Sequence, residues 1–217
     1  AVTLALTYAE VQYETLWDEQ VFNGELSQYD WLHLHHEDFT GQYGKFYRNY
    51  HTASWYIEQK RQFESLAMRL GFSSVPEQKK ALAQIIKDYV SRGGFLFAMC
   101  SATDSFDIAL ATLGLDAAHT VYDGTPIDKQ LMDKIDFTKS LAFNNFEIIS
   151  DPMVYEYSDI DFPPSNNVVV RGAEADYFSL FEFSAKYDPV PTMLTQNHVG
   201  TIKGFMGQTT GFDRNKI

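Results

Sequence analysis

The stretch from Gly93 to Leu113 places the only cysteine of the chain between two different hydrophobic patterns. Five apolar residues, Phe95 to Met99, follow a glycine pair and lead into Cys100. After Cys100 the apolar residues change to a helical spacing, at Phe106, Ala109, Leu110 and Leu113. The pattern predicts a buried strand, a sharp turn and a helix, which is an order typical of parallel α/β sheets.

Cys100 would then lie at the carboxyl end of a strand, where α/β sheets bind ligands, and near the positive end of a helix. A thiol in that position is more readily held as the thiolate, which is the nucleophile. The alternative is a cysteine that only packs, because cysteine is among the most buried residue types. Ser101 and Asp104 are expected to cap the following helix, and both are also candidate binding residues.

Composition limits the classes of partner. The chain has 217 residues, 45% of them hydrophobic, which favours one main packed domain. A net charge of −12, without a cluster of Lys or Arg, disfavours nucleic acid as a partner. The apolar runs are far shorter than the roughly 20 residues of a membrane-spanning helix, so we expect a soluble chain with no membrane span.

The compartment stays open, because a single cysteine cannot form an internal disulfide and fits the cytoplasm and the periplasm equally. The chain starts at Ala1 without a Met or a signal peptide, which suggests a mature or trimmed product that lacks flanking segments. Oligomeric state is not indicated.

Periodicity and turn residues predict the other elements. Those of the first half are a helix at Val2–Tyr8, a short strand at Tyr13–Trp17, a connection at Asp18–Gln28, a strand at Tyr29–His35, a helix from Ser54 to Gly71 and a helix from Ser74 to Gly93. Ser74 and Glu77 form a capping box for the last of these. In the second half, Asp116–Asp136 is expected to be an exposed excursion. Antiparallel strands are expected at Ile148–Tyr157, Val168–Val170 and Tyr177–Phe183.

The loop from Glu37 to Thr52 is polar and aromatic, and its length favours a functional loop at the mouth of a site. The aromatic residues of the region 43–56 could form a wall for a sugar or a peptide, although such residues are more often core, and they are Tyr43, Tyr47, Tyr50, Trp55 and Tyr56. Asp38 and Gly41 in this loop are candidate binding residues.

Three histidines and two acids end the strand that precedes this loop. On a strand, His33, His35 and Glu37 would share one face, so a metal site on His33 and His35 is conceivable, although no further ligand is evident. A second interpretation is structural: these polar residues at the end of the strand form hydrogen bonds to the loop that follows. A third gives His35, His36 or Glu37 a catalytic role beside Cys100, because a thiol nucleophile needs a base.

Two further groups complete the candidate site. His198 is an alternative base. The N–H of Ser101 and one amide of the loop from Glu37 to Gly41 are the expected donors to an oxyanion.

Three segments, Tyr29–Tyr47, Gly93–Asp104 and Pro191–His198, resemble a Bacteroidetes family whose members are often labelled asparagine synthetase B. That family is related to class I glutamine amidotransferase-like proteins. The resemblance covers nearly the whole chain. It implies one amidotransferase-like domain over residues 1–217 with a flavodoxin-like, three-layer sandwich and a mostly parallel sheet. It also implies a cysteine at the nucleophile elbow, a small-molecule substrate and no cofactor.

The motifs differ from those of active relatives. Relatives with glutaminase activity carry Gly-x-Cys-x-Gly and His-x-Glu, where this chain has Ala98 to Ala102 and His198-Val199-Gly200. The chain also lacks an amino-terminal catalytic cysteine and a Ser-Gly-Gly loop, so the motifs do not support asparagine synthetase activity. The main hypothesis is a cysteine-dependent hydrolase of an amide or related carbonyl. The alternatives are a non-catalytic domain that binds carbohydrate or protein, and a metal-dependent hydrolase using His33 and His35.

Overall fold

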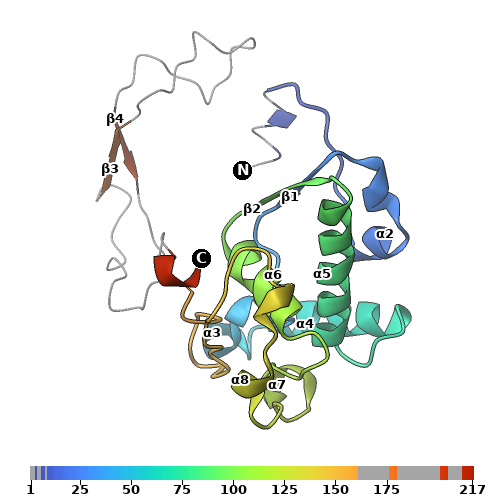
Figure 1. Cartoon of the computed structure of the whole chain (residues 1–217), viewed down its shortest axis with the longest axis vertical. Coiled ribbons are helices and arrows are strands. Elements are labelled where there is room, and N and C mark those ends of the chain that lie inside the picture. The colour runs from blue at the N-terminus through green and yellow to red at the C-terminus, as the bar shows by residue number, and fades with distance from the viewer. Residues whose placement is uncertain (1–2, 4–5, 8, 161–175, 180–200, 205–211) are drawn as a thin grey trace. The chain divides into compact units, whose positions relative to one another are not determined.

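The computed structural model describes residues 3, 6–7, 9–160, 176–179, 201–204 and 212–217 (Figure 1). Contacts divide the chain into two compact units, one formed by Ala1–Thr15 with Pro163–Thr210 and the other by Leu16–Phe162 with Gly211–Ile217. In the first unit, strand β3 (Asp176–Ser179) pairs antiparallel with β4 (Thr201–Gly204). The described residues of the second unit include every candidate site residue except His198.

The second unit is a mixed helix and strand structure with a small parallel sheet. Strand β1 (Trp31–Leu34) pairs parallel with β2 (Phe95–Ala98), and Leu34 lies opposite Ala98. The crossover between them runs through three helices, α3 (Tyr47–Tyr50), α4 (Ser54–Arg69) and α5 (Val75–Ser91). The predicted pair of strands and the α/β character are therefore confirmed at this coarse level.

The two faces of this sheet have different environments. Leu32, Leu34, Leu96 and Ala98 pack against the core formed with α5 and α6 (Ser101–Ala111). The opposite face carries aromatic side chains that are exposed, at Trp31, Phe95 and Phe97. The prediction of a fully buried strand at Phe95–Met99 is therefore wrong, because its residues alternate between the core and the exposed face.

Helix α5 begins as the capping pattern predicts. The Ser74 hydroxyl accepts the N–H of Glu77 at 3.3 Å, and Pro76 lies in the first turn, where a missing N–H costs nothing. The Glu77 carboxylate accepts the N–H of Ser73, one residue before the position that a full capping box uses.

Helix α6 lies between two hydrophobic cores, and nine of its eleven residues are buried. Phe106, Ala109 and Leu110 face the core shared with the sheet and α5. Ile108 and Ala111 face a second core with Phe143, Phe146, Tyr157 and Ile160. A helix that is apolar on most sides is typical of the interior of a domain.

Two buried residues of this helix are charged, Asp104 and Asp107, and the partners of Asp107 fix a neighbouring loop. The buried carboxylate of Asp107 accepts the N–H groups of Leu141, Ala142 and Phe143 at 2.7–2.8 Å, which fixes that loop to α6.

Several sequence predictions are wrong. Residues 13–17 form no strand, and the predicted connection contains α2 (Asp18–Phe22) and the 3-10 turn η1 (Glu25–Gln28). Residues 148–157 contribute only an isolated bridge from Ile148 to Ser158.

The predicted excursion at Asp116–Asp136 contains α7 (Thr120–Asp123) and α8 (Leu131–Lys134), and Ala118, Tyr122 and Leu131 in it are buried. A 3-10 turn η3 (Phe137–Lys139) follows. Val168–Val170 lies outside the described residues.

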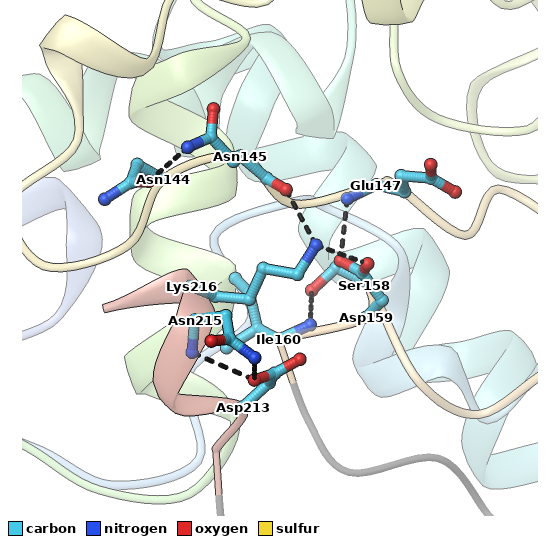
Figure 2. Close-up of polar contacts among 9 residues, drawn as sticks. All are labelled: Asn144, Asn145, Glu147, Ser158, Asp159, Ile160, Asp213, Asn215 and Lys216. Atoms are coloured by element: carbon cyan, nitrogen blue, oxygen red, sulfur yellow. Dashed lines mark hydrogen bonds and ion pairs between the residues drawn. The ribbon is translucent and has the colours of Figure 1, made fainter.

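Figure 2 shows how the last described residues attach to the second unit. Asp213 donates its N–H to the carbonyl of Ile160, and its carboxylate caps the 3-10 turn η6 (Arg214–Lys216) through Asn215. Lys216 Nζ contacts the Asn145 carbonyl and the Asp159 carboxylate, each at 2.7 Å. These contacts close the chain onto residues 144–160.

Among the helices of the described residues, none combines the length and the apolar character that a membrane crossing requires.

Candidate functional site

The parallel pairing brings the residues that follow β1 and β2 to the same edge of the sheet. The N–H of Met99 donates to the carbonyl of Leu34 at 3.0 Å, which extends the pairing to the last residue before Cys100. His35 and Cys100 therefore both lie just beyond the paired ends of the two strands. The two strand ends share one edge of the sheet, as the sequence predicted, and a crevice at this edge stays a prediction.

Cys100 lies in a backbone conformation that L-residues rarely adopt. Its φ is 55° and its ψ is −138°, and it occupies the N-cap position between β2 and α6. The residue is exposed. Such a conformation costs about 1–3 kcal/mol and is concentrated at functional sites. A strand, a strained residue and a helix in this order match the geometry called a nucleophile elbow, which raises the side chain above the sheet.

Ser101 and Asp104 do not cap α6 as the sequence predicted. Cys100 holds the N-cap position, Ser101 is the first helical residue, and Asp104 is buried one turn later. The first turn is instead secured by backbone and hydroxyl contacts, in which Thr103 donates its N–H and its hydroxyl to the Cys100 carbonyl.

Ser105 connects the first turn of α6 to the loop that follows β1. Its buried hydroxyl accepts the N–H of Phe39 at 3.3 Å and lies 3.2 Å from the Glu37 carbonyl. It also contacts the Ser101 carbonyl. The loop after β1 is thus held directly against the helix that starts at Cys100. Sequence analysis did not identify Ser105.

The histidines at the end of β1 form a contiguous set. The rings of His35 and His36 stack with their centroids 3.9 Å apart, and the His33 and His35 rings lie 6.4 Å apart. Burial, followed by the charge of His36, lowers the pKa of His35 below its ordinary value, and the Glu37 carboxylate opposes this shift. A histidine with a lowered pKa is neutral at physiological pH and can accept a proton.

Glu37 does not orient an imidazole in this structure. Its carboxylate accepts the backbone N–H of His35 at 2.5 Å. The contact of Glu37 is thus made to the main chain of its own segment, and its catalytic role stays a prediction.

Asp38 organises the loop that follows. Its carboxylate accepts the N–H and hydroxyl of Thr40 at 2.8 and 2.6 Å, and the N–H of Gly44 at 2.9 Å. The amides of Phe39 and Thr40 are therefore engaged within the protein, so an oxyanion donor in this loop would come from another amide of residues 37–41.

The first part of the predicted loop is not at the surface, because residues 39–43 and Lys45 are buried, whereas residues 48–52 of the same loop are exposed. The position of the loop at the mouth of a site stays a prediction. The loop turns through η2 (Tyr43–Lys45). Gly41 has a φ of 73°, and a Cβ there would lie 2.6 Å from the backbone N of Pro76. Gly41 therefore serves close packing against the start of α5. Its role in binding stays a prediction.

Lys45 is a buried cation that the sequence did not indicate as such. Its ammonium donates to the carbonyls of Ile149 and Asp151 at 2.8 and 3.0 Å. Burial lowers the pKa of Lys45 to about 8, while the carboxylates of Asp38, Asp151 and Glu156 act in the opposite direction. The only indication in the sequence is the nearby Gly41 and Gly44, which mark turns that can bring a side chain inside.

The structure adds no further ligand to the hypothesis of a metal site on His33 and His35. Among the described residues, no group of three or more His, Cys, Asp or Glu side chains could hold a metal ion. His198, the alternative base, lies outside the described residues.

A separate open cavity of about 330 Å³ lies between residues of α3 and α4 and includes none of the predicted site residues. Comparisons with protein-family models, curated proteins and solved structures found no match to the chain.

Proposed function

We propose that the second unit carries a cysteine-dependent hydrolase site for an amide or related carbonyl, with Cys100 as the nucleophile. The observation that supports it is the exposed Cys100, with its positive φ, between a parallel strand and a helix. The resemblance of residues 29–47 and 93–104 to amidotransferase-like proteins supports the same class of reaction. The proposal includes a flavodoxin-like sheet, of which β1 and β2 would be the two central strands.

The reaction would follow the usual course for a thiol nucleophile. The Cys100 sulfur gives its proton to a base and attacks the carbonyl carbon, and the displaced electron pair moves to the carbonyl oxygen. The N–H of Ser101 and an amide of residues 37–41 stabilise that oxyanion. Collapse expels the amine, which takes the proton back from the base and leaves a thioester. Water then hydrolyses the thioester with the same base, releasing the acid and the thiol.

His35 is the candidate base with the best support from the described residues. It follows the strand that pairs with the one before Cys100, and its lowered pKa keeps the imidazole neutral. His36 stacks on it, and His198 remains a third candidate.

The rate at which iodoacetamide alkylates Cys100 tests the proposal. At neutral pH we expect alkylation at least about tenfold faster than that of a cysteine peptide with an ordinary thiol pKa of about 8.5. Changing the base, in His35→Asn or His36→Asn, should bring the rate close to that of the peptide. His119→Asn is the matched control, because asparagine can keep the helix cap that His119 provides to α7. Alkylation no faster than the peptide would exclude a nucleophilic Cys100.

A second assay measures the reaction itself. Ammonia release is followed with glutamine, asparagine and other primary amides, using the wild-type chain and Cys100→Ser. We expect release from at least one amide, and its loss in the variant. Because Ala98 and Ala102 stand where glutaminases have glycine, glutamine is not the preferred amide in this proposal. Release that persists in Cys100→Ser would assign the chemistry to another residue.

A further inference from the structure

Ser105 joins the loop after β1 to the first turn of α6 through a single oxygen atom. Its side chain is completely buried. The hydroxyl accepts the Phe39 N–H at 3.3 Å and lies 3.2 Å from the Glu37 carbonyl, and these partners are 66 and 68 positions away in the sequence. Within the helix it contacts the Ser101 carbonyl. Two segments that meet only in the folded chain are therefore held at one spacing.

The contacts of Ser105 also determine which way the amides of the loop point. The Glu37 carbonyl and the Asp38 N–H belong to one trans peptide, so they point in opposite directions. Because the carbonyl faces the Ser105 hydroxyl, the Asp38 N–H points away from it. The next two amides are occupied, that of Phe39 by Ser105 and that of Thr40 by the Asp38 carboxylate. Of the three amides at 38–40, that of Asp38 is left for a ligand.

The first turn of α6 offers the second amide. Ser101 is the first residue of the helix, where a backbone N–H has no partner within the helix. The next amide, that of Ala102, donates to the Met99 carbonyl at 3.2 Å. Ser105 contacts the carbonyl of Ser101 one turn later. The same hydroxyl thus holds both the residue beside Cys100 and the loop that faces it.

We propose that Ser105 is a positioning residue of the hydrolase site, which fixes the spacing between the N–H groups of Ser101 and Asp38 so that both reach the oxyanion. This inference rests on the proposed function, because it requires Cys100 to attack a carbonyl. Donors that are fixed before the reaction stabilise the developing charge without reorganisation. A small displacement of one donor therefore lowers the rate strongly. Ser105 itself acts through the backbone and does not touch the substrate.

Thr112, at the other end of α6, is a hydroxyl with a purely structural role and provides the comparison. It is also completely buried. Its hydroxyl contacts the carbonyls of Ile108 and Ala109 at 2.7 and 3.5 Å, and both of these residues belong to α6. Ser105 makes the same kind of contact four residues back along the helix and adds the loop. Removing each hydroxyl separates the effect of the loop from that of a buried hydroxyl in the helix.

Two reagents separate the positioning role from the reactivity of the thiol. Iodoacetamide is attacked at a saturated carbon, where the Cys100 thiolate displaces iodide and no oxyanion forms. p-Nitrophenyl acetate is attacked at its carbonyl, so the sulfur bonds to the carbon and the displaced electron pair moves to the oxygen. Collapse expels p-nitrophenolate and leaves an acetyl thioester on Cys100. Only the second reaction needs the amide donors.

The full 217-residue chain is used for both reactions. Ser105→Ala should slow the acetylation of Cys100 by at least about tenfold and change its alkylation by less than about twofold. Thr112→Val is the matched control and should leave both rates within about twofold, because no loop depends on its hydroxyl. Absorbance follows p-nitrophenolate above the background of Cys100→Ala, and mass spectrometry locates the acetyl group. Circular dichroism establishes that each variant is folded.

Amide hydrogen exchange, measured by NMR, tests the loop without depending on the reaction. In the wild type we expect the Phe39 amide to be protected and the Asp38 amide to exchange at least about tenfold faster. Ser105→Ala should accelerate the exchange of the Phe39 amide, whereas Thr112→Val should not.

The outcomes separate this inference from the proposed function. If Cys100 of the wild type is acetylated and Ser105→Ala reacts equally fast, the positioning role is wrong and the hydrolase proposal stands. Equal losses in both reactions, or in Thr112→Val, would give Ser105 a general structural role and overturn the inference. A wild type that is alkylated slowly and not acetylated would overturn the proposed function together with this inference. An Asp38 amide as protected as that of Phe39 would overturn the inference whatever the rates.

Discussion

The two parallel strands end at the same edge of the sheet, yet the chain that leaves them is strained in different ways. After β2 a single residue, Cys100, has a positive φ, and it is exposed. After β1 the loop has four positive φ values at Gly41, Tyr43, Gly44 and Lys45, and only Gly44 of these is not fully buried.

The difference lies in what offsets the strain. In the β1 loop, the Asp38 carboxylate binds two backbone amides, and the Lys45 ammonium binds two carbonyls. These contacts stabilise the folded loop and explain its conformation without any ligand. The strained backbone at Cys100, in contrast, does not bury the side chain, because Cys100 is exposed. This is the pattern expected where a reactive group must be presented.

The largest effect expected from this comparison is at Gly41. Gly41→Ala should lower the free energy of unfolding by more than about 3 kcal/mol, because the new Cβ would lie 2.6 Å from the backbone of Pro76. Gly71→Ala is the control, since Gly71 has a similar φ of 88° and no atom within 4 Å, and should cost only about 1 kcal/mol. Urea unfolding measures both. Equal losses would mean that the loop is not tightly packed against α5.

Lys45→Met should come next, with a loss of about 2–3 kcal/mol. Methionine keeps the length of the side chain but leaves the carbonyls of Ile149 and Asp151 without their donor. The exposed Lys129 provides the matched variant, Lys129→Met, which should change stability by less than about 0.5 kcal/mol. A stable Lys45→Met would show that the strain in this loop is not offset by the ammonium.

The stabilising effect of Lys45 should depend on pH. Its pKa is about 8 in the folded chain and about 10.5 when unfolded, so between these values the unfolded chain binds more protons. Stability from this group therefore rises with pH through that window, by at most about 1.4 kcal/mol per pH unit, and is lost as pH falls through about 8. The neutral amine still has two N–H donors for its two carbonyls.

The measurement is the difference in unfolding free energy between wild type and Lys45→Met at both ends of this window. Other titrating groups are common to the two chains and cancel. A difference that shrinks as pH rises would contradict the assignment.

The smallest effect is expected at Cys100, where two variants of the same residue are compared. Cys100→Gly should be more stable than Cys100→Ala by about 1 kcal/mol, because glycine adopts this φ and ψ without strain. At an ordinary helix or strand position alanine would be the more stable of the two. Thermal unfolding of the two variants decides the question, and an alanine variant that is equally stable would remove the strain on which the elbow rests.

Much of the second unit follows from local patterns. The apolar periodicity of α4, α5 and α6 predicts these helices from the sequence, and the beginning of α5 is also marked by its cap at Ser74. The turn at Cys100 was predictable for the same reason, because two periodicities meet there. Asp107 could have been suspected as well, since an acid within an apolar helical run must find buried partners.

The remainder depends on contacts between distant residues. The apolar run Phe95 to Met99 predicts a buried strand, yet one face of the strand is exposed, and composition alone does not separate these cases. The loop after β1 looked like surface because it is polar, but its polar groups bind one another inside the protein. Residues 148–157 have strand-like composition without a partner strand, so pairing and not propensity decided the outcome.

The hydrogen bond from Asp213 to Ile160 has a consequence for engineering. The chain departs at Ile160 and returns to the same point at Asp213, so the two ends of the intervening stretch are separated by the width of one backbone pair. A linker of a few residues can span such a gap. Replacing that stretch with a short linker, or with a foreign module whose ends lie close together, should leave the sheet edge and the thiol of the second unit in place.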